Sequence, residues 1–520
     1  MKVYPSLKEF FQIKKKIPSK INLFVLSLRF FSDYLTPLSV YFSLGKIFKE
    51  ESFLLESVEG EEKISRYSFL GFKPLVIFKS KEKEIYIKEE KKEKVFTVNS
   101  SDPLEELEKL FRRFKVWPKK NLRFFGGFVG YIGYDFVRFI EPVGEGLPDD
   151  IDTADLYFIL PKFLIIFDHL KKEIEILSFS PLEKFEASLY QKEKNLLERI
   201  FKIILQPSPL KPLDLEEKAS LKFSSNFKKR EFLKEVEKAK EYIKDGEIIQ
   251  VVFSQRFRTS FKKDPLLVYR YLRLLNPSPY MYYLDFKDLK IVGASPEMLL
   301  RCENKVLITR PIAGTRPRGK NEEEDKYLEE ELLKDSKERA EHLMLVDLAR
   351  NDLGKVAKKG TVKVPIFMKI EKFSHVMHIV SEVRAILDKK YDMFDALRAC
   401  FPAGTVSGAP KVRAMQIINE LELQRRGIYA GCVGYFSFTD SLDTCIIIRT
   451  IIFKNNYAYV QAGAGIVFDS NPEKEYKETV NKAKAQFLAL CLAQKGGGDE
   501  RDKRKLSGKR KKNWYCNIKI

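Results

Sequence analysis

Apolar residues recur with helical spacing at residues 228–244. The apolar side chains follow one another at steps of three or four residues, which places them on one helix face: Phe232, Val236, Ala239 and Ile243. We therefore predict an amphipathic helix here. Two further helices are expected at about residues 337–350 and 473–493.

Other apolar runs indicate strands. Residues 248–257, 445–453 and 457–467 are predicted as strands, and the first two hundred residues contain short apolar runs separated by turn residues. Helices and strands follow each other in irregular order, which favours an α+β architecture over a repeating βαβ one.

Proline residues mark the best internal boundary. Pro207, Pro209 and Pro212 lie within six residues and predict a connection that is neither helix nor strand. We expect an N-terminal region at 1–210, a catalytic region at 220–493 and a basic tail at 496–520. The tail follows three glycines and has no periodicity, so it is predicted to be disordered.

The composition supports a large folded protein. Of the 520 residues, 44% are hydrophobic and 13% aromatic, enough for an extensive core. The net charge of +21 first suggests a nucleic-acid partner. However, elsewhere runs such as residues 79–94 mix both signs, as solvated surfaces do, and the tail concentrates positive charge. We therefore expect no nucleic-acid partner.

The sequence also favours the cytoplasm. Residues 1–16 are too rich in lysine for a signal peptide, and the longest apolar stretch, residues 156–167, is interrupted by Pro161 and Lys162. No membrane contact is expected. Six scattered cysteines form neither a disulfide framework nor a Cys-x-x-Cys pair, which suits a reducing compartment.

Two predicted helices carry paired carboxylates. Glu338 and Glu341 are three residues apart, as are Glu475 and Glu478, so each pair shares a helix face. Four carboxylates facing one cleft would repel each other unless a cation lay between them. Oxygen ligands alone suit Mg²⁺ better than zinc. From spacing alone, simple polar helix faces explain both pairs better than a metal site, because glutamate pairs at this distance are common.

Two glycine-containing turns and a histidine pair are further candidates. Residues 462–465 follow a strand, and residues 401–411 combine glycines, hydroxyls and a lysine before a helix. Both could present backbone N–H groups to an anion, or could be simple turns. His375 and His378 lie in an apolar stretch, where a histidine is either a hydrogen-bonded core residue, a metal ligand or an acid.

The order and wording of several motifs resemble one family, the chorismate-utilising enzymes, and within it anthranilate synthase component I. The resemblance extends from about Thr36 to Cys491. It rests on these strings: LLES at 54–57, NPSPYMY at 276–282, GASPE at 293–297, RPIAGT at 310–315, EHLMLVDLARND at 341–352, FPAGTVSGAPK at 401–411 and QAGAGIVF at 461–468.

This resemblance implies a fold of large sheets flanked by helices and a set of site residues. Glu341 and Glu478 would bind Mg²⁺, with Glu338 and Glu475 as outer partners. The residues expected to bind chorismate are Tyr429, Arg449, Gly463, Ala464, Gly465, Lys482, Gly314 and Thr315, with Thr405 near the ring hydroxyl.

The implied reaction adds ammonia at C2 of chorismate as the C4 hydroxyl leaves, and then eliminates pyruvate to give anthranilate. His378 is our choice of general acid for the leaving hydroxyl. Water-adding relatives, the isochorismate and salicylate synthases, carry a lysine base where this chain has Gln250. The p-aminobenzoate branch, aminodeoxychorismate synthase component I, carries a lysine where this chain has Ala313. Both positions favour anthranilate, and that branch is the alternative.

The resemblance also implies a partner and an inhibitor. The sequence has no Gly-x-Cys-x-Gly turn of a glutaminase, so glutamine-derived ammonia would come from a glutamine amidotransferase subunit, component II. L-Tryptophan would bind a separate regulatory pocket and inhibit, at the first step of its own biosynthesis. The expected lining of that pocket is Glu56, Ser57, Pro279, Tyr280, Met281, Val433, Tyr435 and Cys445.

Overall fold

The computed structural model describes residues 3–14, 21–57, 66–90, 92–98, 102–117, 122–182, 186–215, 220–373 and 376–495. The tail predicted at 496–520 and His375 lie outside the described residues.

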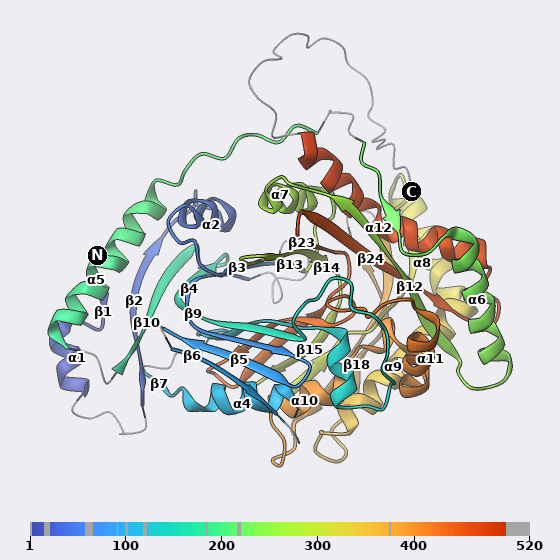
Figure 1. Ribbon diagram of the computed structural model, residues 1–520, viewed down its shortest axis with the longest axis horizontal. Helices are drawn as coiled ribbons and strands as arrows, with labels where there is room; N and C mark the ends of the chain where they lie inside the picture. Colours follow the sequence, from blue (N-terminus) through green and yellow to red (C-terminus); the bar gives the residue numbers. More distant parts are fainter. Residues whose placement is uncertain are drawn as a thin grey trace, which may run out of the picture.

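Two long antiparallel strands form the centre of the fold. β4 (Tyr67–Lys81) pairs with β9 (Leu156–Asp168) from end to end. Their register shifts after Pro74, and Lys73 next to it has a φ of 56°. Because the ladder is irregular at this point, the two halves of each strand can join different neighbours. The result is two packed layers of strands that share β4 and β9 (Figure 1).

The first layer carries the strands that will form the floor of the candidate site. One half of β9 pairs with β10, and one half of β4 pairs with β3. From β3 the ladder continues through β13, β14, β23 and β24 to β12. Its strands, with the short strands at its margins, are β1 (Val3–Tyr4), β2 (Leu23–Phe31), β7 (Val116–Trp117), β10 (Glu173–Pro181), β3 (Ser52–Glu56), β13 (Tyr280–Phe286), β14 (Leu289–Ser295), β23 (Thr450–Lys454), β24 (Tyr457–Ile466), β12 (Gln250–Ser260), β11 (Ser224–Ser225) and β20 (Gly408–Ala409).

The second layer begins at the other halves of β4 and β9. It extends through β8, β21, β22, β15 and β16 to β19, which pairs with both β17 and β18. Its strands are β6 (Lys92–Thr97), β5 (Glu84–Glu89), β8 (Gly127–Ile132), β21 (Cys432–Ser437), β22 (Ser441–Ile446), β15 (Met298–Glu303), β16 (Val306–Thr309), β19 (Val376–Ile386), β17 (Ile312–Pro317) and β18 (Lys363–Lys372).

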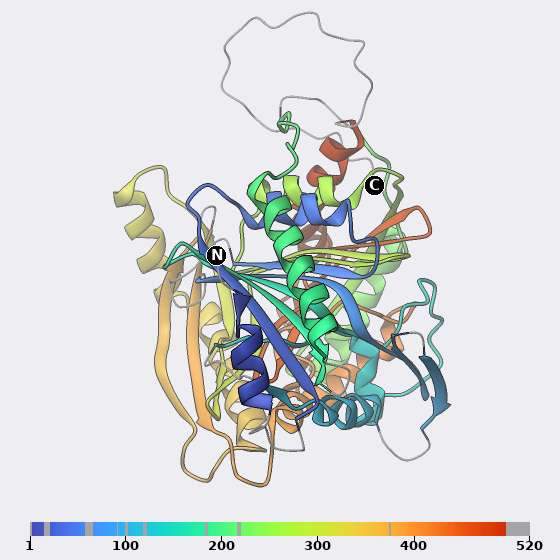
Figure 2. The same ribbon diagram turned by 90° about the vertical axis from the view of Figure 1, so that its left-hand side faces the viewer.

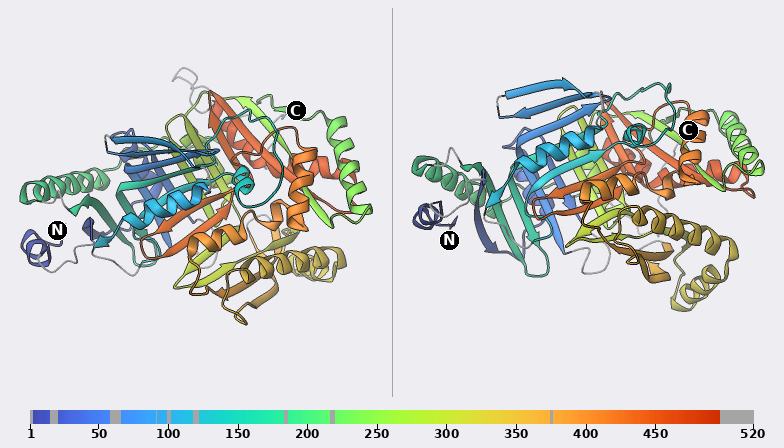
Figure 3. Two further views of the ribbon diagram at one scale, coloured as in Figure 1. Left: turned by 60° about the horizontal axis from the view of Figure 1, so that its bottom comes forward. Right: turned by 90° about the horizontal axis from the view of Figure 1, so that it is seen from below.

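Helices cover the outer faces of the layers. Figure 1 shows α2, α7 and α12 over the first layer and α4 and α10 beneath the second. Helices α8 and α9 pack against β17 and β19, at one flank of the molecule (Figures 2 and 3). The helix bounds are α1 (Leu7–Lys14), α2 (Pro37–Gly45), α4 (Pro103–Arg113), α5 (Ala187–Leu205), α6 (Lys229–Lys244), α7 (Pro265–Leu275), α8 (Glu322–Lys334), α9 (Ser336–Gly354), α10 (Met393–Cys400), α11 (Lys411–Leu421) and α12 (Pro472–Lys495), with short 3-10 turns at Tyr134–Phe139 and Gly404–Val406.

The α+β prediction and the three predicted helices are confirmed, with their ends shifted by a few residues. The single strand predicted at 445–453 is wrong, because the chain forms two strands there. Ile447 exchanges backbone hydrogen bonds with Ala430 and Gly431 instead of continuing the ladder, and Arg449 has a φ of 53°. A single arginine between two runs of good strand formers does not by itself reveal such a turn.

Strands from both sides of the proline-rich boundary pair with each other. Glu56 of β3 is opposite Met281 of β13, and Gly130 of β8 is opposite Gly434 of β21. The three prolines themselves lie in the irregular connection after α5. The division at residue 210 stays a prediction. Within the described residues, no helix is both long and apolar enough to cross a membrane.

Candidate active site

The floor of the candidate site is the antiparallel pair β12 and β24. Gln250 begins β12, and its side chain is so close to β24 that a Cβ on Gly465 would lie 2.6 Å from Gln250 Nε2. In the same way, a Cβ on Gly463 would lie 2.9 Å from Tyr429 Oη. These glycines are therefore required by close approach of functional side chains. Between them, the Ala464 side chain packs into the apolar cluster beneath α6 and α11, so Ala464 can offer the site only its backbone.

The first carboxylate pair lies at the start of α9. Asp335 caps this helix by accepting hydrogen bonds from the amides of Lys337 (3.0 Å) and Glu338 (3.1 Å). Glu341 Oε1 accepts a hydrogen bond from Gln250 Nε2 at 3.0 Å. Burial raises the pKa of Glu338, and the neighbouring charge of Glu341 raises it further.

The second pair lies at the start of α12. Glu478 Oε1 forms an ion pair with Lys482 Nζ at 2.7 Å, and Lys482 Nζ also donates to the Gly463 carbonyl at 3.0 Å. Burial raises the pKa of Glu475, with a further rise from the charge of Glu478. The charge of Lys337 of α9 lowers the same pKa, so the starts of the two helices lie within electrostatic range of each other.

These carboxylates fit a hard divalent cation. Each pair offers only oxygen atoms. The pKa values of Glu338 and Glu475 are raised first by burial and then by the charge of the neighbouring glutamate, and a cation would remove this repulsion. Within the described residues, no group of three or more His, Cys, Asp or Glu side chains is close enough to hold a metal ion by itself. In this arrangement a bound ion would therefore take at most two of these carboxylates and complete its shell with water or substrate.

His378 lies on β19 beside the bulge of β17. Its Nδ1 is 2.9 Å from the Gly314 carbonyl and 3.0 Å from Thr315 Oγ1. Because a carbonyl can only accept, Nδ1 carries the proton and Nε2 is left for another partner. Burial lowers the pKa of His378, and the Arg449 charge lowers it further against the effect of the Gly314 carbonyl. Gly314 has a φ of 69°, a conformation that glycine adopts without strain.

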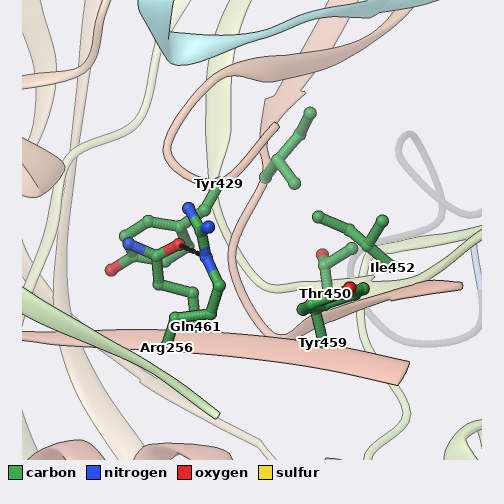
Figure 4. Close-up of a pocket in the computed structure, with 7 residues that line it drawn as sticks. Arg256, Tyr429, Thr450, Ile452, Tyr459 and Gln461 are labelled. Atoms are coloured by element: carbon green, nitrogen blue, oxygen red, sulfur yellow. Dashed lines mark hydrogen bonds between the residues drawn. The ribbon is translucent and has the colours of Figure 1, made fainter. Parts of the chain in front are cut away.

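Arg449 and Tyr429 are the remaining side chains predicted to bind the substrate. Arg449, at the turn between β22 and β23, donates to the Lys482 carbonyl. Tyr429 is buried, and burial raises its pKa to about 12 while the charges of Arg426 and Arg449 act in the opposite direction. The phenol therefore stays neutral and can donate a hydrogen bond to an anion. Figure 4 shows Tyr429 beside a small cavity of about 240 Å³, where Arg256 Nε donates to Gln461 Oε1 at 3.0 Å.

Sequence reasoning missed Glu297 as a site residue. This glutamate lies between β14 and β15 and lines a pocket with Thr405. Burial raises its pKa to about 8, although the Thr405 hydroxyl and the Lys482 ammonium act in the opposite direction. The only sign of this site in the sequence was that Glu297 is a single acidic residue between two apolar strands. Its burial and its neighbours from distant parts of the chain became visible only in the fold.

A second pocket, of about 570 Å³, lies between the two layers. All eight residues predicted for a regulatory site line it: Glu56, Ser57, Pro279, Tyr280, Met281, Val433, Tyr435 and Cys445. The structure therefore brings together segments that are hundreds of residues apart.

Polar groups in this pocket are partly engaged. Glu56 accepts a hydrogen bond from Tyr269 at 2.6 Å and pairs with Arg273 at 3.3 Å, and burial raises the Glu56 pKa. In contrast, the buried hydroxyls of Ser57 and Tyr435 find no hydrogen-bond partner in the part of the chain that the structure describes. A buried polar group without a partner is costly, so a polar ligand would be stabilised here.

Comparison with known proteins identifies the family of the chain. The sequence pattern described as chorismate binding enzyme matches residues 50–487. Anthranilate synthase component 1 from Aquifex aeolicus is 50% identical over 484 residues, covering 92% of this chain and 97% of the relative. The protein of the same name from Pseudomonas aeruginosa is 43% identical over 479 residues, covering 91% of this chain and 96% of the relative.

Solved structures agree as well. Anthranilate synthase component I from Streptococcus pneumoniae has a TM-score of 0.74 at 39% identity and covers 82% of this chain and 93% of its own. The menaquinone-specific isochorismate synthase from Escherichia coli, at 20% identity and a TM-score of 0.67, covers 93% of this chain and 98% of its own and shares the fold. The resemblance seen in the motifs is confirmed, and the chain belongs to the family of chorismate-binding enzymes.

Proposed function

We propose that this protein is the large subunit of anthranilate synthase, which converts chorismate and ammonia to anthranilate and pyruvate. The observation that carries the proposal is the hydrogen bond from Gln250 to Glu341 at the floor of the cleft. It puts a neutral amide next to a proposed metal ligand. An amide cannot remove a proton from water, whereas ammonia is a nucleophile without such help. The identity of 50% to a relative of this name supports the same reading.

The cleft residues bind and orient the substrate. Arg449 and Tyr429 would hold the enolpyruvyl carboxylate, and Lys482 with the backbone of Gly463 and Gly465 would hold the ring carboxylate. A C–N bond then forms at C2, and the C4–O bond breaks as the hydroxyl takes up a proton and leaves as water. In the second step C2 loses a proton and the enolpyruvyl group leaves as pyruvate, so that the ring becomes aromatic.

We propose Mg²⁺ as the cofactor. Glu341 and Glu478 would hold it directly, and Glu338 and Glu475 through water. When bound, the ion would withdraw electron density from the ring carboxylate and favour addition at the neighbouring carbon. The two glutamate pairs supply the oxygen ligands that Mg²⁺ prefers.

Two groups compete for the role of general acid. His378 faces the bulge that carries Thr315, and its Nε2 is available, but its lowered pKa disfavours the protonated form. Glu297 has a pKa of about 8 and therefore keeps its proton at neutral pH. We keep His378 as the proposed acid and take Glu297 as the second candidate, because its raised pKa suits proton donation near pH 7.

Ammonia would come from a partner. The relatives are named component 1, which implies a second component, and we propose that this is a glutamine amidotransferase. The cytoplasm is the proposed location, and the described cysteines are unpaired, as is usual in a reducing compartment.

We further propose that L-tryptophan binds the 570 Å³ pocket and inhibits. The Ser57 hydroxyl and the Glu56 carboxylate would receive the ammonium group, and the segment 279–281 would contact the indole. Since Glu56 and Met281 are paired across β3 and β13, a ligand that changes their spacing acts on strands from both regions of the chain. Such coupling is reciprocal, so chorismate must weaken tryptophan binding by the factor with which tryptophan weakens chorismate binding.

The proposal is tested by incubating the purified protein with chorismate, Mg²⁺ and an ammonium salt, with anthranilate detected by fluorescence and all products separated by chromatography. Glu341→Gln, which keeps shape but removes a charge, is the control and should lose activity by orders of magnitude. Aminodeoxychorismate or isochorismate as the main product would refute the assignment. Full activity in excess EDTA would refute the metal site.

A further inference from the structure

Arg316, at the end of β17, uses all five of its N–H donors. Its Nε and Nη2 donate to the two oxygens of Glu331 at 2.6 and 2.9 Å. Nη2 also donates to Asp335 Oδ2 at 2.8 Å. Nη1 donates to Glu338 Oε1 at 3.3 Å and to the Thr315 carbonyl at 3.0 Å. Five acceptors match the five donors that a guanidinium group presents.

The acceptors belong to three different elements. Glu331 lies in the last turn of α8, and Thr315 lies on β17. Asp335 is the N-cap of α9: its Oδ1 caps the helix, while its Oδ2 receives Arg316. The guanidinium therefore joins α8, β17 and the start of α9 at one point.

Glu338 lies against β17. One carboxylate oxygen receives Arg316, and the other lies 3.2 Å from the position that a Cβ of Gly314 would occupy. Glu338 is therefore next to the strand that also positions His378 through Gly314 and Thr315. Glu341 follows one turn later on the same helix, so any shift at the start of α9 moves both carboxylates.

We propose that Arg316 is a positioning residue that sets the distance between the metal-binding start of α9 and the substrate-binding strand β17. This inference rests on the proposed function, because it takes Glu338 and Glu341 as metal ligands. The guanidinium also keeps three carboxylates, Glu331, Asp335 and Glu338, close together despite their mutual repulsion. A lysine at this position keeps the charge but has three donors and no fork, so it cannot hold all five acceptors.

The chain offers a matched control in Arg318. Its Nε donates to the two oxygens of Asp325 at 3.1 and 2.9 Å, and its Nη1 donates to the Phe373 carbonyl at 2.8 Å. Asp325 lies on α8, as Glu331 does, but the described contacts of Arg318 include none with α9. Arg318→Lys therefore breaks a fork of the same kind on the same helix without touching the proposed metal ligands.

The experiment titrates Mg²⁺ into the purified wild-type protein, Arg316→Lys and Arg318→Lys by calorimetry without substrate, and measures Tm for each. We expect Arg316→Lys to weaken Mg²⁺ binding about tenfold, the lower end of the effect of residues that orient metal ligands. The Mg²⁺ concentration for half-maximal activity should rise in parallel, and excess Mg²⁺ should restore kcat. Arg318→Lys should leave Mg²⁺ binding unchanged.

Unchanged Mg²⁺ affinity in Arg316→Lys, or equal weakening in both variants, would overturn the inference. Absence of Mg²⁺ binding to the wild-type protein would instead refute the metal site of the proposed function, and the inference with it. If Arg316→Lys does not fold, Glu331→Gln removes the partner on α8 and leaves the site carboxylates intact. That variant should weaken Mg²⁺ binding in the same direction, and an unchanged affinity would overturn the inference.

Discussion

The acid that protonates the leaving hydroxyl can be identified from its pH dependence. Burial raises the pKa of Glu297 to about 8. At pH 7 about ten molecules carry the proton for each ionised one, and at pH 9 the ratio is reversed. If Glu297 is the acid, kcat/KM for chorismate should therefore fall about tenfold between pH 7 and pH 9. Glu297→Gln should lower the rate and remove this fall.

His378 predicts a different profile. Its pKa lies below the ordinary value of 6.5 because burial disfavours the imidazolium. The imidazolium is therefore lost as the pH rises through the acidic range, and it is already scarce at pH 7. If His378 is the acid, kcat/KM should already be falling as the pH rises towards 7, and it should continue to fall about tenfold for each further pH unit, about a hundredfold between pH 7 and pH 9.

The assay is the initial rate of anthranilate fluorescence from pH 5.5 to 9.5, with excess Mg²⁺ and with free ammonia held constant. The quantity kcat/KM is used because it reports groups of the free enzyme, to which these pKa values apply. A fall near pH 8 that persists in Glu297→Gln would refute the reasoning about Glu297. A profile that is flat from pH 5.5 to 9.5 would refute both assignments.

Three further outcomes are expected. Gln250→Lys places an ammonium beside Glu341, where Gln250 now donates at 3.0 Å. This variant should need more Mg²⁺ for half-maximal activity and should form some isochorismate. An unchanged Mg²⁺ requirement together with no isochorismate by chromatography would contradict the nucleophile argument. Gly314→Ala introduces a Cβ at a φ of 69° and 3.2 Å from Glu338 Oε2. The variant should destabilise the protein by about 1 kcal/mol or more and raise the KM for chorismate. An unchanged Tm would argue against strain at this position. Ser57→Ala should relieve tryptophan inhibition and leave uninhibited kcat intact, and calorimetry with unchanged tryptophan affinity would place the regulatory site elsewhere.

Local periodicity was enough to predict a helix beside the site and one that carries part of it. Residues 228–244 and 473–493 repeat their apolar side chains every three or four residues, and both form helices. The spacing of three residues within each glutamate pair also predicts that its members share a helix face. These features depend on neighbours within one or two turns, and the sequence contains that information directly. The order of the motifs was enough for the family.

Tertiary structure decided what depends on distant neighbours. The turn at Arg449 interrupts a run of good strand formers, and it forms because Ile447 bonds to the segment at 430–431. The side chain of Ala464 points away from the cleft, since alternation along β24 puts Gly463 and Gly465 on the other face. Glu297 is a proton donor candidate only because the fold buries it among residues more than a hundred positions away. Burial and packing arise from the whole chain, so no local pattern determines them.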